Sequence, residues 1–143
     1  MMPLTSTHFR AAVLATVLGL ALSLVVPAIG LVSFSPEVEA ARSWNYFDSV
    51  LPLRGVVVWH SLWGTVALAG LVGSFFFWGP ARWLLAASLL LSVAAQPFLG
   101  LVVYSSFEAS FAAISGMLML WIVTVSFWSP LASRFVEGAV RAP

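Results

Sequence analysis

The sequence contains no cysteine and no lysine, and it has few charged residues of either sign. The absence of cysteine excludes disulfides, thiolate metal sites and catalysis by a thiol. Charged residues make up 8% of the 143 residues, whereas a typical globular protein has about 25%. A soluble domain of this length must cover a large surface with polar groups. The composition therefore predicts a protein whose solvent is mainly lipid.

Several classes of chemistry also lack the residues that they need. Apart from Glu108 at the outer edge of the last one, no acidic residue lies within the long hydrophobic runs, which disfavours cation-coupled antiport, because that process normally needs a carboxylate in the membrane. The chain has no HExxH motif, no glycine-rich phosphate loop and no paired carboxylates. A formal net charge of +1 gives no reason to expect nucleic acid as a partner. We predict no catalytic residues and no metal site, and a non-enzyme is favoured over an enzyme.

Hydrophobic residues make up 62% of the chain, and they are concentrated in four runs. Each run has about the 20 residues that a helix needs to cross a bilayer. Backbone polar groups cannot stay unpaired in lipid, so each run should be helical. We predict one all-α membrane domain, residues 1–143, with four transmembrane helices arranged up-down-up-down. The predicted spans are residues 11–32, 55–77, 82–103 and 107–129.

The first run also has features of a secretory signal peptide, with Arg10 as the basic region and Val38-Glu39-Ala40 as a cleavage site. The run is too long for that role and ends well before the site, so we predict that it is retained. Both termini then lie on one side. Arginine predominates on that side, which places the termini in the cytoplasm and the chain in the inner (plasma) membrane. The arginines on that side are Arg10, Arg82, Arg134 and Arg141, against Arg42 and Arg54 on the other.

The links between the predicted spans differ in length. Residues 78–80 and 104–106 are short enough for tight hairpins, so consecutive helices should be neighbours. The longer link carries Ser35-Pro36-Glu37, which reads as an N-cap, a proline at the first helical position and an acidic first turn. We predict a short interfacial helix here, ended by Pro52, which serves as a lid or as a docking or gating element. Its apolar face would be Ala40, Trp44, Phe47 and Leu51.

His60 is the only ionisable residue in the second predicted span. It lies roughly 7 Å below the outer end of that span at a rise of about 1.5 Å per residue. Ionisable groups inside a membrane are costly and often mark functional sites. His60 is therefore a candidate haem ligand, quinone hydrogen-bond donor or proton carrier. The alternative is a structural hydrogen bond to a carbonyl, to Tyr104 or to water.

Gln96 and Ser115 lie at similar depth in the third and fourth predicted spans. An amide and a hydroxyl that face each other across two helices would form a structural hydrogen bond. Alternatively, they line one outward-opening pocket with His60 and Tyr104, and Glu108 lies at its mouth. Such a pocket would accept a quinone headgroup or another polar small molecule.

The sequence resembles four-helix membrane cytochromes in two places. Residues 59–64 (WHSLWG) are similar to their ligand helix, and residues 96–100 (QPFLG) are similar to a stretch of the haem A synthase half-bundle. The resemblance implies a haem held by paired histidines. No histidine in the fourth span completes such a pair, and His8 lies across the membrane, about 25–30 Å from His60. We therefore do not predict from the resemblance that this chain binds haem by itself. A haem b shared with another subunit, or a quinone, remains a candidate cofactor.

These observations lead to three hypotheses of function. The first is a small non-catalytic subunit of a larger membrane complex of the respiratory, photosynthetic or oxygenase type, which places it in electron transport. The second is a haem- or quinone-binding redox protein that uses His60 and Gln96. The third is a homo-oligomeric carrier or channel for small molecules. The predicted partners are the lipid bilayer and either other membrane subunits or further copies of this chain.

Overall fold

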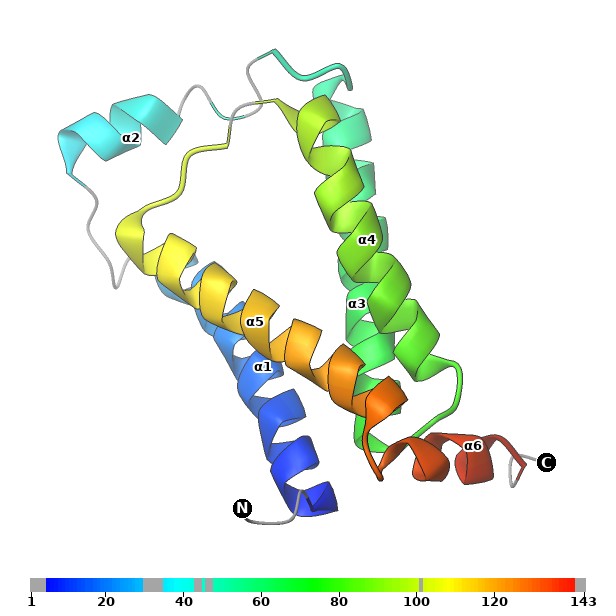
Figure 1. The fold of residues 1–143 in the computed structure, drawn as a ribbon. Helices are drawn as coiled ribbons and strands as arrows, with labels where there is room; N and C mark the ends of the chain where they lie inside the picture. Colours follow the sequence, from blue (N-terminus) through cyan, green and yellow to red (C-terminus); the bar gives the residue numbers. More distant parts are fainter. Residues whose placement is uncertain (1–4, 30–34, 43–44, 46–47, 101, 141–143) are drawn as a thin grey trace.

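The computed structural model describes residues 5–29, 35–42, 45, 48–100 and 102–140, and every regular element in these ranges is a helix (Figure 1). Four of the helices are long and apolar enough to cross a membrane, and their directions alternate along the chain. The predicted four-helix membrane fold is therefore confirmed. The helices are α1 (Ser6–Ala28), α2 (Pro36–Arg42), α3 (Leu53–Phe75), α4 (Ala81–Leu99), α5 (Ser106–Trp128) and α6 (Ala132–Val140).

Local chemistry sets the ends of the long helices. Helix α1 begins at Ser6 rather than at residue 11, because the Thr5 side chain accepts a hydrogen bond from the His8 amide and caps the helix. Helix α4 ends at Leu99 rather than at residue 103, because Gly100 has a φ of 74°, which glycine adopts without steric cost. Helices α3 and α5 begin and end within two residues of their predicted bounds.

The four long helices form two pairs, in which α1 packs along α5 and α3 packs along α4. Figure 1 shows that the pairs meet near α6, here called the α6 end, and diverge toward α2, the α2 end. The sequence predicts that consecutive spans are neighbours, and α3 and α4 lie side by side as predicted. The predicted tight hairpin before α5 is wrong, because residues 100 and 102–105 are not helical, and α4 and α5 are in contact only where the pairs meet. The chain uses this link to cross from one pair to the other.

The best-packed part of the core lies at the α6 end and is aromatic. Phe9 of α1 stacks on Phe77 with ring centroids 5.4 Å apart, and Phe135 of α6 meets both rings edge-on at 5.8 and 5.2 Å. Phe77 follows α3 with a φ of 57°, and its amide and the next amide bond back to the carbonyls of Ser74 and Gly73. These bonds close the helix end and turn the Phe77 ring into the core.

Helix α2 is shorter than the sequence predicts. It begins as expected at Pro36, and the Ser35 hydroxyl accepts a hydrogen bond from the amide of Val38. A backbone amide and the Ser35 hydroxyl lower the pKa of Glu37 by hydrogen bonding. The predicted end at Pro52 is wrong, because α2 ends at Arg42 and Pro52 instead precedes the first residue of α3. Trp44 and Phe47 of the predicted apolar face lie outside the described residues.

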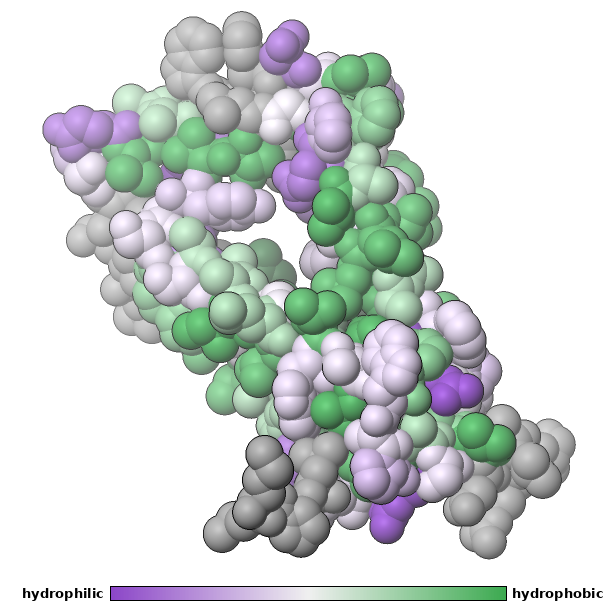
Figure 2. Space-filling model, viewed as in Figure 1, coloured by the Kyte–Doolittle hydropathy of each residue, from purple (hydrophilic) through white to green (hydrophobic). Residues whose placement is uncertain are grey.

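Most of the surface of the two helix pairs is apolar. Between 17% and 28% of the residues in each membrane span are buried within the chain. Figure 2 shows hydrophobic side chains over the outside of α3 and α4, and it shows an opening that passes between the two pairs. The helices therefore bury only part of their apolar surface against one another.

Candidate functional site

His60 lies in α3 and is partly buried. Its Nδ1 lies 2.8 Å from the carbonyl oxygen of Val56, one turn earlier. A carbonyl can only accept, so Nδ1 carries the proton and donates it to this bond. This is a structural hydrogen bond to a carbonyl, one of the two roles that the sequence left open for His60.

Ser115 is buried against α1. Ser115 is 1% exposed, and its hydroxyl would be 2.5 Å from a Cβ placed on Gly19 of α1. Its oxygen has no hydrogen-bond partner among the described residues, so the predicted hydrogen bond to Gln96 is not formed. Gln96 is exposed in the last turn of α4, and Tyr104 is 57% exposed in the link before α5. The convergence of His60, Gln96 and Tyr104 on one pocket stays a prediction.

An apolar cavity of about 300 Å³ lies between α1 of one pair and α3 of the other. Gly64 is part of its wall, and a Cβ placed on Gly64 would meet no atom within 4 Å. Trp63 is held beside it, because the indole N–H donates a hydrogen bond of 2.9 Å to the Ser88 carbonyl of α4. The cavity is lined by Val17, Leu20, Ala21, Leu24, Trp63, Gly64, Ala67, Leu68 and Leu71.

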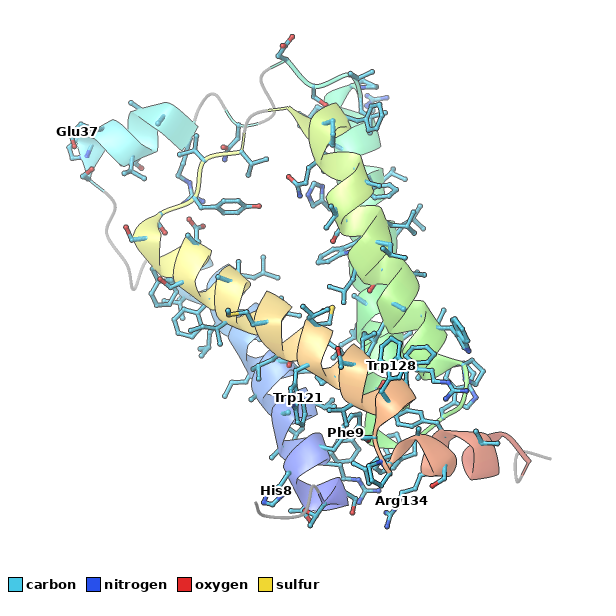
Figure 3. The ribbon with its side chains drawn as sticks, viewed as in Figure 1. His8, Phe9, Glu37, Trp121, Trp128 and Arg134 are labelled. Carbon is cyan, nitrogen blue, oxygen red and sulfur yellow. The ribbon has the colours of Figure 1, made fainter. Side chains whose placement is uncertain are left out.

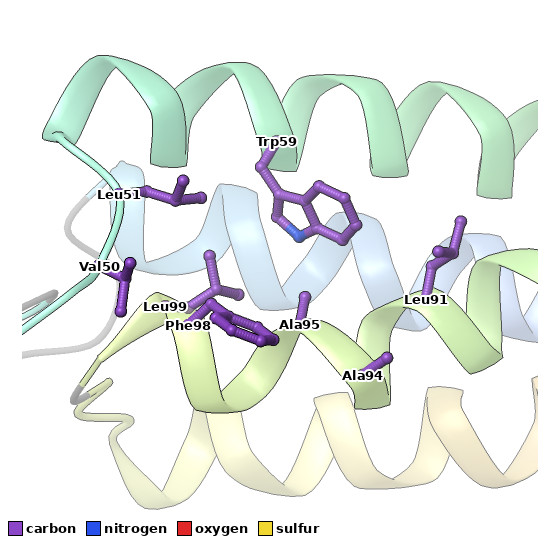
Figure 4. A pocket seen from close by; sticks show the side chains of 8 residues that line it. All are labelled: Val50, Leu51, Trp59, Leu91, Ala94, Ala95, Phe98 and Leu99. Carbon is purple, nitrogen blue, oxygen red and sulfur yellow. The ribbon is translucent and has the colours of Figure 1, made fainter.

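A second apolar cavity, of about 360 Å³, lies between α3 and α4 near the α2 end (Figure 4). The flat rings of Trp59 and Phe98 stand on opposite helices in its wall. Trp59 precedes His60 in the sequence, yet neither His60 nor Gln96 lines the cavity. Its wall consists of Val50, Leu51, Trp59, Leu91, Ala94, Ala95, Phe98 and Leu99.

Polar contacts join the helix pairs to the loops at the α2 end. Arg42 of α2 binds both carboxylate oxygens of Glu108 in α5, at 3.0 and 2.9 Å. Glu108 also accepts a hydrogen bond from the Ser105 amide, in a capping box that fixes the start of α5. The amide of Val103 donates to the side-chain oxygen of Asn45 at 2.6 Å. The outer segments therefore bridge the ends of the diverging pairs.

We expect Glu108→Gln to lower the free energy of unfolding by about 1 kcal/mol, because one Arg42 nitrogen contacts both oxygens of a carboxylate that is only 12% exposed. Thermal unfolding of the detergent-solubilised protein measures this effect. Glu39→Gln, at an exposed carboxylate of α2, is the matched control and should leave the stability unchanged. Equal losses in both variants would contradict a structural role for the pair.

Other polar residues do not extend the candidate site. Figure 3 places His8 at the α6 end, whereas His60 lies in the part of α3 near the α2 end. The two histidines therefore cannot form a ligand pair. Within the described part of the chain, no three His, Asp or Glu side chains lie close enough to hold a metal ion.

No family model, curated protein or solved structure matches the chain.

Proposed function

We propose that this chain is a small, non-catalytic integral subunit of a larger membrane protein complex, of the respiratory, photosynthetic or oxygenase type. The observation that carries the proposal is the opening between the two helix pairs. A closed four-helix bundle would bury the facing sides of all four helices. Here α1 and α3 leave an apolar cavity between them instead.

The opening is held in place from both ends. Phe9, Phe77 and Phe135 join the pairs at the α6 end; at the other end the Arg42–Glu108 ion pair ties α2 to α5, and the Val50 amide of the following link donates to the Phe98 carbonyl of α4. The divergence of the pairs is thus built into the fold. A transmembrane helix of another subunit supplies the side chains that would fill such a gap by van der Waals packing.

Gly64 supports a close approach by such a helix. Small residues at helix contacts in membranes let two backbones come near each other. The side of Gly64 that would carry a Cβ faces open space and not a neighbour within the chain. A partner helix can therefore pack directly against the α3 backbone at this position.

We expect Gly64→Trp to abolish assembly while leaving the chain folded, because the indole fills the cavity without meeting an atom of the chain near its Cβ. Native gel electrophoresis of membranes in mild detergent measures the assembly. The wild-type chain should migrate in a complex much larger than a monomer, and the variant should migrate alone.

Leu90→Trp is the matched control, because Leu90 is 73% exposed on α4 and does not line this cavity. This variant should assemble normally. A monomeric wild-type chain, or a Gly64→Trp variant that still co-migrates with its partners, would contradict the proposal. A complex that contains only copies of this chain would favour the carrier or channel hypothesis.

The orientation is part of the same proposal. Arg10, Arg82 and Arg134 belong to the α6 end, whereas Arg42 and Arg54 belong to the α2 end. The excess of arginine supports a cytoplasmic location for the α6 end, with the chain in the inner membrane. A haem or quinone bound by His60 and Gln96 stays a prediction from the sequence. A Soret band in the purified protein that His60→Ala removes would establish the haem.

A further inference from the structure

A third cavity, of about 600 Å³, lies at the α6 end between the start of α4 and α6. Arg82 is the only charged residue among the described residues of its wall. The rest of the wall is aromatic and aliphatic, so the cavity combines one fixed positive charge with an apolar surface. It is lined by Gly79, Pro80, Arg82, Trp83, Leu84, Ala87, Phe135 and Val136.

The Arg82 guanidinium lacks a counter-ion in the described part of the chain. Its Cζ lies 5.0 Å from the ring centroid of Phe127 and 6.0 Å from that of Trp83, so two aromatic rings hold it in place. Its Nε is buried and has no hydrogen-bond partner among the described residues. A buried N–H without a partner is costly, and a guanidinium matches the oxygens of a phosphate with two parallel hydrogen bonds.

The start of α4 adds positive potential to the same cavity. Gly79 and Pro80 precede the helix and line the cavity. No side chain caps this helix start, and its first turn contains no acidic residue. The amides of Ala81 and Trp83 already donate to the carbonyls of Trp78 and Pro80, so the contribution of this helix start is its dipole, which favours an anion beside it.

The surroundings of the cavity are those of a membrane interface. Figure 1 shows α6 lying across the ends of the long helices. Phe135 of α6 is buried together with Leu131, which directly precedes the helix, whereas Ser133 and Arg134 are exposed, so α6 has one apolar and one polar side. Such a helix lies in the plane of the headgroups. Leu84 and Ala87 extend the cavity wall along α4, in the direction that lipid chains take.

We propose that this cavity binds the phosphate of an anionic phospholipid from the leaflet at the α6 end. Arg82 donates hydrogen bonds to the phosphate oxygens, beside the uncapped start of α4. The acyl chains of the lipid lie against Leu84 and Ala87. Arg10 and Arg134, which lie 5.4 and 5.6 Å from the Phe77 ring at the same end, add to the attraction for anionic lipid in general.

Native mass spectrometry of the detergent-solubilised protein, titrated with phosphatidylglycerol or phosphatidylcholine, tests this proposal. We expect the wild-type chain to bind phosphatidylglycerol more tightly than phosphatidylcholine. Arg82→Gln should weaken phosphatidylglycerol binding about tenfold and leave phosphatidylcholine binding unchanged. Arg54→Gln, at an exposed arginine of the α2 end, is the matched control and should bind both lipids as the wild-type chain does.

Val136→Glu keeps the test decisive if Arg82→Gln does not fold. Val136 is 54% exposed and lines the cavity, so a carboxylate there repels the phosphate without disturbing the core. Normal phosphatidylglycerol binding by both cavity variants, or equal losses in Arg82→Gln and Arg54→Gln, would overturn the proposal. Displacement of the lipid by millimolar inorganic phosphate would overturn it as well, because the ligand would then be a free anion.

Discussion

Replacement of Gly70 by leucine is expected to break the packing of α3 against α4. A Cβ at Gly70 would lie 2.8 Å from Cγ of Leu85 and 3.1 Å from its backbone nitrogen. The backbone of α4 cannot yield without separating the two helices. Overpacking of this kind costs about 1–3 kcal/mol, and more for a large side chain, so we expect a loss of at least about 2 kcal/mol. Unfolding by SDS in mixed micelles measures this free energy.

Gly64→Leu is the matched control for this experiment, because it makes the same change in the same helix. A Cβ at Gly64 meets no atom within 4 Å. The free energy of unfolding of the isolated chain should therefore change by less than about 0.5 kcal/mol. If both variants lose the same stability, the contact between Gly70 and Leu85 is not what holds the α3–α4 pair together.

Phe9→Ala should have an effect of similar size at the α6 end. Phe9 is fully buried and contacts Phe77 and Phe135, and Trp121 lies 6.3 Å from its ring centroid (Figure 3). Truncation of a buried phenylalanine leaves a cavity and costs about 3–5 kcal/mol. We expect a loss near the lower value, about 3 kcal/mol, because lipid weakens the hydrophobic part of the effect and leaves the packing part.

Phe76→Ala is the control for this loss, since the Phe76 side chain is 69% exposed and lies outside the aromatic core. It should unfold as the wild-type chain does in the same SDS titration. A Phe9→Ala variant that is as stable as Phe76→Ala would show that the aromatic cluster does not join the helix pairs. The opening between the pairs would then lose its support at that end.

The sequence predicts the membrane spans because hydropathy depends only on local composition. It also predicts the start of α2, since an N-cap and a first-position proline act within one turn. Helix α6 was not predicted, although Phe135 and Leu131, the residue before the helix, are spaced four residues apart and both are buried. That spacing is the signal that could have found it, and the exposed Arg134 between them makes the segment polar on average.

The candidate site depends on helix rotation, which composition does not specify. Ser115 and Gln96 have similar predicted depth, yet the Ser115 hydroxyl points to Gly19 of α1. The pairing of α1 with α5 decides this direction, and a pairing between segments far apart in the sequence has no local signal. The ion pair of Glu108 with Arg42 could not be predicted either, because the two residues are far apart in the sequence and Arg42 belongs to a helix that hydropathy does not detect.

The pairing of α1 with α5 has a consequence for biosynthesis. Helices α3 and α4 are neighbours in the sequence, so their contact can form as soon as the ribosome has released both. Helix α1 enters the membrane first, but its main partner, α5, is the last long helix to emerge. Until α5 emerges, α1 therefore has only its smaller contact with α3 within the chain. The α1–α5 pair, unlike the α3–α4 pair, forms only after all four long helices have been made.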